Sequence, residues 1–327
     1  MAQVKKRHLH IVMGSEGVMV QQSRVFHMMG TVIEATVEHE NAGEIIANIG
    51  QMLTMYEHRF SANDANSELG QVNQAAGSCP VSVHPDLFEL AQVGKKHSCA
   101  SCSLLNIAIG PLVQSWRIGF SDAKVPDDQE IQQLLKIIDP ENIILDKDAQ
   151  TIFLTKRGMK IDLGALAKGY IADRVIDYLK KEAVTSALIN LGGNLVVWGP
   201  APRRLDGEWR IGIQNPNKTR GDSQIILKVS NQSVVTSGIY ERHLKKNSQS
   251  YHHILNPETG YPVETNIASL TIVSDLSVDG EIWTTRLFSK RIPDILGQIE
   301  LLPGIEGLII TQSGQVLTTS GLKEKIV

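Results

Sequence analysis

The sequence predicts an α+β fold, in which antiparallel sheets are packed against long helices. Three observations lead to this prediction. The first half of the chain has long segments with helical periodicity, the second half is rich in short strands separated by turns, and strands do not alternate regularly with helices as in βαβ units. The 327 residues suffice for one large domain or two ordinary ones, and no long linker or low-complexity segment divides them.

The first half is predicted to contain one clear strand and several helices. Residues 31–39 (TVIEATVEH) alternate apolar and polar side chains, as a half-buried strand does. The helical spacing of apolar residues predicts helices in three places, at residues 42–60, 85–97 and 127–139. Residues 61–74 are polar and indicate a loop that enters a short helix and could touch a ligand. Residues 142–163 indicate a strand meander.

The second half is predicted to consist mainly of strands. Residues 187–199 read as two apolar strands joined at Gly192-Gly193-Asn194. Further strands are expected at residues 208–216, 223–231, 233–238 and 267–274. Residues 250–263 lead from a strand into an Asn-Pro-Glu-Thr-Gly turn. Two helices are expected at residues 279–290 and 292–302, followed by a closing hairpin at residues 307–321.

Composition and charge exclude several classes of protein. Hydrophobic residues make up 42% and charged residues 20% of the chain, which is typical of a globular protein. The net charge is −3 and basic residues occur only in short groups such as Lys5-Lys6-Arg7, so we expect no nucleic-acid partner. No apolar run reaches the roughly 18 residues of a membrane helix, and the N-terminus lacks a signal-peptide stretch and a lipid-attachment cysteine. As it stands, the sequence predicts a cytoplasmic protein.

The three cysteines, at positions 79, 99 and 102, form an odd and sparse set that does not indicate a disulfide framework. Cys99 and Cys102 have CxxC spacing, but neither a second pair nor a nearby histidine pattern accompanies them. We therefore interpret them as small residues at a helix end.

A lysine occupies the first turn of the helix that residues 160–179 (KIDLGALAKGYIADRVIDYL) predict. We expect Asp162 or Gly164 to begin this helix, which places Lys168 where the macrodipole is positive. A cation is disfavoured there by roughly 0.3–1 kcal/mol, and a bound anion such as a phosphate group would reverse that sign. The alternative is a solvated lysine whose side chain bends away from the helix end.

Several glycine-containing stretches occur in an order that is more informative than any one of them. Each alone is also typical of an ordinary turn. In chain order they are MGT, DLGALAKGYIAD, NLGGN, TSGIYER and HHILNPETGYP, followed by a helix with an acid and a threonine four residues later. In these motifs and their spacing, the chain resembles the ApbE family of FAD:protein FMN transferases from about residue 24 to 320. The resemblance implies two related, T-fold-like halves in a single domain over residues 24–327, after an N-terminal segment of residues 1–23.

The resemblance also implies an activity. Members of the family use FAD as substrate with a divalent cation, usually Mg²⁺, and transfer FMN to a Ser or Thr hydroxyl of a target protein through a phosphoester bond, releasing AMP. We see no second domain with a flavin-acceptor motif, so we expect a separate acceptor protein. Two alternatives remain open: a metal-dependent FAD hydrolase and a non-catalytic FAD-binding protein. Many members are exported lipoproteins, and removal of a leader would give a chain that begins like this one.

The metal site is implied by similarity. The Ala165 carbonyl, Glu281 and Thr285 would be the ligands, and a hard cation does prefer such oxygen donors. Glu281 and Thr285 have the i, i+4 spacing that brings side chains together on a helix. Family members more often have Asp at the position of Glu281, so Asp279 remains an alternative ligand.

The substrate contacts are implied in the same way. Asp162 and Lys168 would contact FAD, and a lysine at a helix start can neutralise charge on phosphoryl oxygens. His253 matches the family histidine, and it could take a proton from the acceptor hydroxyl or bind phosphate. Thr259 would shape the turn that faces the flavin.

The expected contacts with the flavin ring come from the first half of the chain. Met29 matches a family methionine and could lie on the ring, because thioethers adapt to flat aromatic surfaces. Asn63 stands where the family often has an aromatic residue. The family sequence Gly-Ala-Phe-Asp is represented by Ser103 together with Leu104, Leu105 and Asn106, the last three of which we expect at the flavin site.

Overall fold

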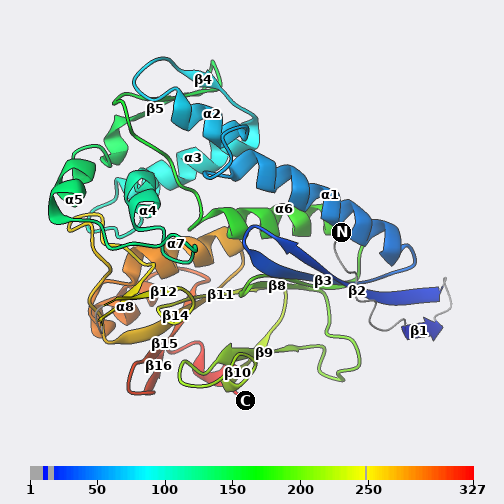
Figure 1. Cartoon of the computed structure of the whole chain (residues 1–327). Coiled ribbons are helices and arrows are strands. Elements are labelled where there is room, and N and C mark those ends of the chain that lie inside the picture. Colours follow the sequence, from blue (N-terminus) through cyan, green and yellow to red (C-terminus); the bar gives the residue numbers. More distant parts are fainter. Residues whose placement is uncertain (1–9, 14–17, 247–248) are drawn as a thin grey trace.

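The centre of the molecule is a nine-stranded antiparallel sheet (Figure 1) in a computed structural model that describes residues 10–13, 18–246 and 249–327. Every neighbouring pair in it is antiparallel. In spatial order its strands are β1 (His10–Met13), β2 (Val18–Met28), β3 (Thr31–His39), β7 (Ser186–Leu191), β8 (Asn194–Trp198), β11 (Ser233–Gly238), β14 (Ile267–Ser274), β15 (Glu306–Thr311) and β16 (Val316–Thr318).

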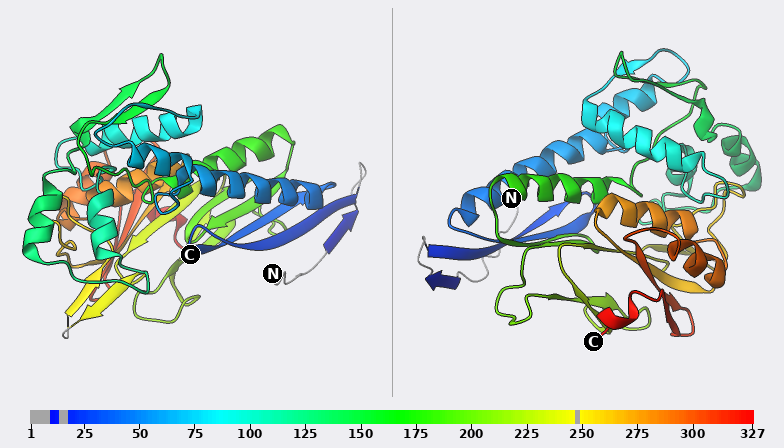
Figure 2. Two further views of the ribbon diagram at one scale, coloured as in Figure 1. Left: turned by 45° about the horizontal axis from the view of Figure 1, so that its top comes forward. Right: turned by 180° about the vertical axis from the view of Figure 1, so that it is seen from behind.

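Helices cover one face of this sheet, as Figures 1 and 2 show from opposite sides. They are α1 (Ala42–Phe60), α6 (Ala167–Lys181), α7 (Ser277–Leu287) and α8 (Ile292–Ile299). The predicted alternation in β3 is confirmed, because Ile33, Ala35 and Val37 are buried beneath α1 and α6 while their neighbours are more exposed. The predicted α+β class is therefore correct.

A hairpin packs on the opposite face of the sheet. It consists of β9 (Trp209–Gln214) and β10 (Ser223–Val229), beside the short 3₁₀ helix η2 (Lys323–Lys325). Its buried residues Ile211 and Leu227 join a core with Val234 of β11 and Leu308 of β15. The second half of the sheet is thus a middle layer, apolar on both faces.

A lobe of residues 61–160 is inserted between α1 and α6 and lies above them in Figure 1. Its elements are α2 (Glu68–Gln74), β4 (Val81–Ser82), α3 (Pro85–Ser98), α4 (Gly110–Trp116), α5 (Asp128–Leu135), η1 (Pro140–Asn142), β5 (Ile143–Asp146) and β6 (Thr151–Leu154). A second hairpin, β12 (His243–Lys246) with β13 (Gln249–His252), packs its Leu244 and Tyr251 against α4 and α5.

Most predicted elements are present, and several boundaries differ from expectation; the helices predicted at residues 279–290 and 292–302, for example, end at Leu287 and Ile299. The predicted start of α6 at Asp162 or Gly164 is wrong, because the Asp162 side chain accepts the Gly164 N–H at 2.7 Å and a separate turn follows before Ala167. Helix α5 ends at Leu135, earlier than the periodicity suggested. The expected boundary between residues 23 and 24 lies inside β2.

Two contacts between the part of the sheet from β1 to β8 and the part from β11 to β16, with their helices, bear on the site: the pairing of β8 with β11 and the packing of α6 on α7. At the second contact, Asp173 of α6 accepts the N–H groups of Ser277 and Val278 at 2.7 and 2.9 Å, which satisfies free donors at the start of α7. Gly169 makes the close approach feasible, since a Cβ atom there would lie 2.7 Å from the Ser277 carbonyl oxygen. The relative position of α6 and α7 is therefore fixed within narrow limits.

The Gly169→Ala substitution should destabilise the protein by about 1–3 kcal/mol, because the added methyl group meets backbone that cannot easily move. Gly297→Ala on the exposed side of α8 is the matched control. A Cβ atom there meets nothing within 4 Å, so it should stabilise the protein by about 0.5–1 kcal/mol through helix propensity. Urea unfolding of both variants measures the difference, and equal effects would contradict the proposed close contact.

Candidate functional site

The site is centred on an ion pair between α6 and α7. Lys168, the second residue of α6, places its Nζ 2.9 Å from Oε1 of Glu281 in α7. The Glu281 side chain is only 6% exposed, whereas that of Lys168 is 29% exposed. The unusual lysine in the first helical turn is therefore paired with a buried carboxylate, and its Nζ also lies 3.5 Å from the Gly164 carbonyl oxygen.

The Glu281 carboxylate is held from the sheet as well as from α6. Asn194, the first residue of β8, is buried and donates from Nδ2 to Glu281 Oε1 at 3.1 Å. Its Oδ1 accepts from the Ser277 hydroxyl at 2.6 Å, so both ends of the amide are used. The Gly192-Gly193 turn, with φ values of +66° and +100°, sets Asn194 at this point. These bonds fix the orientation of the Glu281 carboxylate.

The segment before α6 is held at its start by hydrogen bonds to two distant parts of the chain. Asn73 of α2 accepts the Ile161 N–H at 2.7 Å and donates to the Ile161 carbonyl at 3.0 Å, as a neighbouring strand would. The next N–H, that of Asp162, donates to the Ile107 carbonyl at 2.8 Å. Burial raises the pKa of the Asp162 carboxyl, while the Gly164 N–H and the charge of Arg242 oppose the rise. The turn that carries Ala165 thus has little freedom.

Three oxygen atoms that could act as metal ligands make no hydrogen bond with the described residues. They are Oε2 of Glu281, the hydroxyl of Thr285 one helical turn later, and the carbonyl of Ala165. Such a set suits a hard cation, which needs oxygen ligands that are not already engaged. Asp279 lies at the start of α7, where its pKa is raised by burial and by Asp275, and it is not the partner of Lys168. Glu281, and not Asp279, is therefore the carboxylate that contacts Lys168.

His253 follows β13 and is held by main chain. Its N–H and its Nδ1 lie 3.2 and 3.3 Å from the Arg242 carbonyl oxygen. An oxygen acceptor requires that Nδ1 carry the proton, which leaves the Nε2 lone pair free. Burial lowers the pKa of His253 to about 4, and the charges of Arg242 and Lys168 act in the same direction. The neighbouring His252 differs, because its Nε2 contacts the Val263 carbonyl and its Nδ1 accepts the Ile254 N–H.

The residues expected near the flavin ring lie on separate loops. Met29 has a left-handed backbone with φ of +53°, and its N–H donates to Glu57 Oε1 at 2.5 Å. Thr259 is exposed and its hydroxyl accepts the Tyr261 N–H at 3.3 Å, which shapes the predicted turn. Asn63 is also exposed. No hydrogen bond or ion pair between described side chains joins these three residues to Lys168 or Glu281.

The side chains of Leu104, Leu105 and Asn106 are buried or hydrogen-bonded to main chain. Leu104 and Leu105 are buried, at 5% and 2% exposure, in two different hydrophobic cores. The Asn106 amide donates to the Ile138 carbonyl at 2.8 Å and accepts the Ala108 N–H at 2.8 Å. The two leucine side chains thus pack in the interior, and the main chain is engaged at the Leu104 N–H, which donates to the Arg286 carbonyl, and at the Leu105 carbonyl, which accepts from the Ser103 hydroxyl. That this segment lies at the flavin site stays a prediction.

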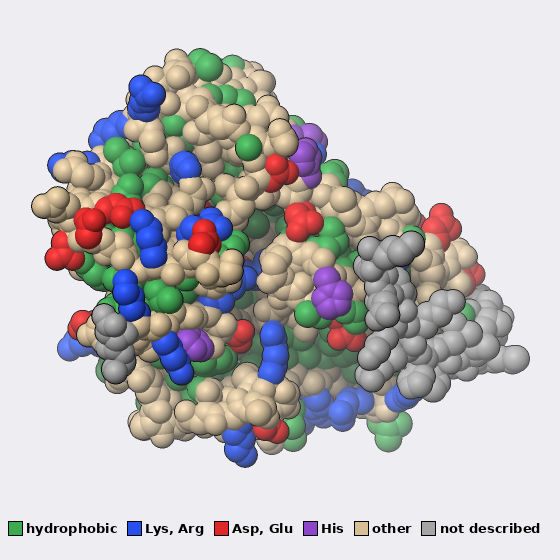
Figure 3. Space-filling model, viewed as in Figure 1, with side chains coloured by type: hydrophobic (Ala, Val, Ile, Leu, Met, Phe, Trp, Pro, Cys, Tyr) green, Lys and Arg blue, Asp and Glu red, His purple; other side chains and the backbone are tan. Residues whose placement is uncertain are grey.

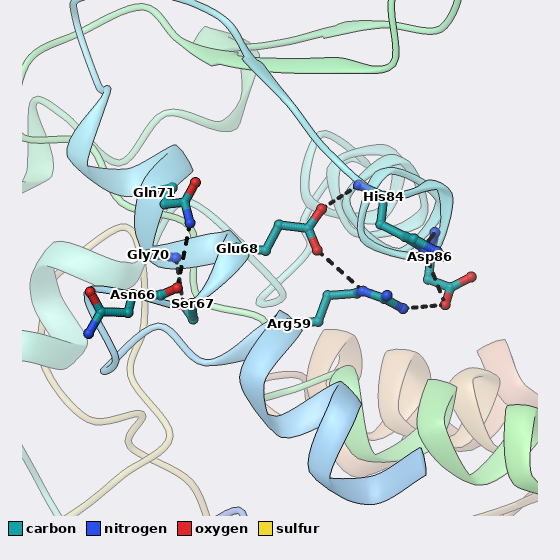
Figure 4. Close-up of polar contacts among 8 residues, drawn as sticks. All are labelled: Arg59, Asn66, Ser67, Glu68, Gly70, Gln71, His84 and Asp86. Carbon is teal, nitrogen blue, oxygen red and sulfur yellow. Dashed lines mark hydrogen bonds and ion pairs between the residues drawn. The ribbon is translucent and has the colours of Figure 1, made fainter. Parts of the chain in front are cut away.

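A network of charges fixes the loop that carries Asn63 (Figure 4). Arg59, at the end of α1, lies between Glu68 of α2 and Asp86 of α3, with N–O distances of 3.2 and 2.7 Å. The hydroxyl of Ser67 accepts the Gly70 N–H at 2.7 Å and donates to the Ser61 carbonyl at 2.6 Å. Both ends of the loop are therefore tied to helix termini.

Two basic residues act on the histidine of the site. Figure 3 shows that Lys and Arg side chains are interspersed with Asp and Glu on this face of the molecule. Lys168 and Arg242 both act on His253, which places them in one electrostatic neighbourhood. This arrangement can attract an anionic ligand.

Sequence reasoning missed three residues of this site. Arg242 and Asn194 lie within the motifs TSGIYER and NLGGN, so their positions were visible but their contacts were not. Asn73 gave no signal, because its partner Ile161 is 88 residues away in the chain. Their roles depend on segments that only the fold brings together.

An α+β enzyme with a basic helix start, free oxygen donors and a neutral histidine is suited to transferring a phosphate-linked group. The ApbE family model matches residues 29–309. An FAD:protein FMN transferase of Klebsiella pneumoniae is 39% identical over 297 residues, covering 90% of each chain, and one of Treponema pallidum is 32% identical over 323 residues, covering 94% and 89%. The chain belongs to the ApbE family, and it is by that membership a transferase.

Solved structures support the same fold. The ApbE protein of Thermotoga maritima superposes with a TM-score of 0.85 at 24% identity, covering 93% of this chain and 99% of its own. The flavin transferase ApbE of Vibrio cholerae gives a TM-score of 0.79 at 23% identity, covering 94% and 99%. Among the described residues, no helix combines the length and apolar character needed to cross a membrane.

His253 should remain neutral throughout the physiological pH range. Its imidazole should titrate with a midpoint near pH 4, as measured by ¹⁵N NMR and assigned by comparison with His253→Gln. Because the folded-state pKa is depressed, its contribution to stability is complete above the usual pKa of about 6.5 and is lost as the pH falls through about 4. A midpoint near 6.5 would contradict the burial and the charges described above.

Proposed function

We propose that the chain is an FAD:protein FMN transferase that moves FMN from FAD to a Ser or Thr hydroxyl of a separate acceptor protein. In this reaction the hydroxyl oxygen forms a bond to the FMN phosphorus, the bond from that phosphorus to the bridging oxygen breaks, and AMP leaves. The observation that carries the proposal is the contact of Lys168 with Glu281, because it joins a phosphate-binding helix start to a buried carboxylate in one site.

Lys168 and the start of α6 would bind the diphosphate. The ammonium group and the unpaired N–H groups of the first turn offer positive charge on one side of the site. Asp173 and Gly169 hold α6 against α7, so this charge stays beside Glu281. Such a preformed arrangement stabilises charge that develops on phosphoryl oxygens without further movement.

The Ala165 carbonyl, Glu281 and Thr285 are the residues that would hold Mg²⁺. The Ala165 carbonyl oxygen, Oε2 of Glu281 and the Thr285 hydroxyl have no hydrogen-bond partner among the described residues, which fits a hard divalent ion. When bound, the ion would neutralise negative charge on the diphosphate. Asn194 would keep the carboxylate aimed at that position, because it donates to Oε1 and leaves Oε2 free.

His253 would accept the proton of the acceptor hydroxyl. Its low pKa and its Nδ1 contact with the Arg242 carbonyl support the role of a base over that of a cationic phosphate ligand. Exposed Thr259 and the half-buried Met29 would border the flavin, at two turns whose backbone is fixed by Tyr261 and Glu57.

Incubation of the protein with FAD and Mg²⁺, with and without a candidate acceptor protein, tests the proposal. We expect release of AMP together with a fluorescent flavin that stays on the acceptor in a denaturing gel. Replacing the acceptor Ser or Thr by Ala should abolish the fluorescence. AMP formed equally without acceptor would instead indicate an FAD hydrolase, and bound but intact FAD would indicate a binding protein.

The Glu281→Gln variant should need about 10–100-fold more Mg²⁺ for half-maximal activity. The amide keeps the length of the side chain and an acceptor for Asn194, but it removes the charge that would bind the cation. Asp279→Asn, two residues earlier on the same helix, is the matched control and should behave like the unmodified protein. A titration of activity and of Mn²⁺ binding by electron paramagnetic resonance measures both variants. If only Asp279→Asn raises the Mg²⁺ concentration needed for half-maximal activity, Asp279 is the ligand.

A further inference from the structure

Arg242 is a basic residue of the site that forms no ion pair within 4 Å with any described carboxylate, although its charge acts on Asp162. It precedes β12, and its side chain is exposed. Its main chain is engaged, since the carbonyl accepts from His253. The backbone at Arg242 is therefore fixed while its guanidinium group remains available to a ligand.

Two glycines guide the Arg242 side chain into the site. A Cβ atom at Gly119 would lie 2.9 Å from Arg242 Cδ, and the φ of +96° there also favours glycine. Further along the side chain, a Cβ atom at Gly30 would lie 3.7 Å from Nη2. The guanidinium group thus ends beside the turn of Met29 and Gly30, which comes from a segment more than 200 residues away in the chain.

The charge of Arg242 reaches the same groups as that of Lys168. It opposes the burial that raises the pKa of Asp162, and it adds to the burial that lowers the pKa of His253. Lys168 contributes to the second effect as well. The two cations therefore both act on His253, Lys168 from α6 and Arg242 from the segment before β12.

The two cations differ in their existing partners. The ammonium group of Lys168 is already 2.9 Å from Glu281, so part of its charge is balanced within the protein. The guanidinium group of Arg242 has no such partner among the described residues, and its planar fork of donors matches two phosphoryl oxygens at once. An anion with two phosphate groups would complement both cations.

We propose that Arg242 binds the diphosphate of the flavin dinucleotide, together with Lys168, with its side chain laid along Gly119 and Gly30. This inference rests on the proposed function, because it assigns a contact for the same substrate. It adds a substrate-binding residue from the TSGIYER segment and explains why position 119 lacks a side chain beside it.

The test compares Arg242→Gln and Arg242→Lys with Lys245→Gln, a matched control that removes an exposed charge from β12 three residues away. Binding of FAD, ADP and riboflavin is measured by calorimetry and flavin fluorescence with EDTA present, so that no turnover occurs. Arg242→Gln should weaken binding of FAD and ADP by about 10–100-fold and leave that of riboflavin unchanged. The affinity of Arg242→Lys for FAD and ADP should lie between those of the unmodified protein and Arg242→Gln, since an ammonium group lacks the planar fork that pairs with two oxygens. Lys245→Gln should bind all three ligands within about twofold of the unmodified protein.

The outcomes separate this inference from the proposed function. If the unmodified protein binds neither FAD nor ADP, both the inference about Arg242 and the proposed function are wrong. If it binds FAD and Arg242→Gln binds equally well, the inference is wrong while the proposed function stands. If Arg242→Gln weakens riboflavin as much as FAD, Arg242 shapes the flavin pocket and the inference is also wrong. Thermal unfolding of each variant, expected to match that of the unmodified protein because Arg242 is exposed, confirms that the fold is intact.

Discussion

The contact between α6 and α7 is the constraint on which the site depends. These helices belong to different halves of the sheet, and the Lys168–Glu281 pair exists only because Gly169 and Asp173 bring the helix starts together. A buried carboxylate is costly unless it is paired and hydrogen-bonded, and here Lys168 and Asn194 satisfy that need. The same groups that hold the Glu281 carboxylate therefore surround the place where we propose that a cation and a phosphate meet.

Side-chain amides perform much of the positioning around this contact. Asn73 pairs with both polar groups of Ile161, and Asn194 links Glu281 to Ser277. Each amide uses a donor and an acceptor, so each can hold two groups from distant segments at once. A ligand that enters the site meets oxygen atoms and donors whose directions are already set, which lowers the cost of ordering them on binding.

The basic residues of the site act in different ways: Lys168 and Arg242 supply positive charge, whereas His253 is neutral. Lys168 and Arg242 are the basic residues of the region where we place the diphosphate, and both act on His253. His253 stays neutral because burial and these two charges lower its pKa to about 4. Positive groups thus do two things together: they favour a bound anion, and they keep an imidazole unprotonated so that it can accept a proton. The adjacent His252 also lowers the pKa of His253, but both of its own ring nitrogens are engaged by main chain.

The sequence by itself determined the fold class, most elements and the family, because alternation and helical spacing report which face of an element is buried. It also placed Glu281 and Thr285 on one helical face, since their separation of four residues is local. Only the tertiary structure decided that Lys168 contacts Glu281, that Leu104 and Leu105 are enclosed in the core, and that Arg242 reaches Gly30. Such contacts join segments far apart in the chain, where local periodicity carries no information, and packing of the whole molecule settles them.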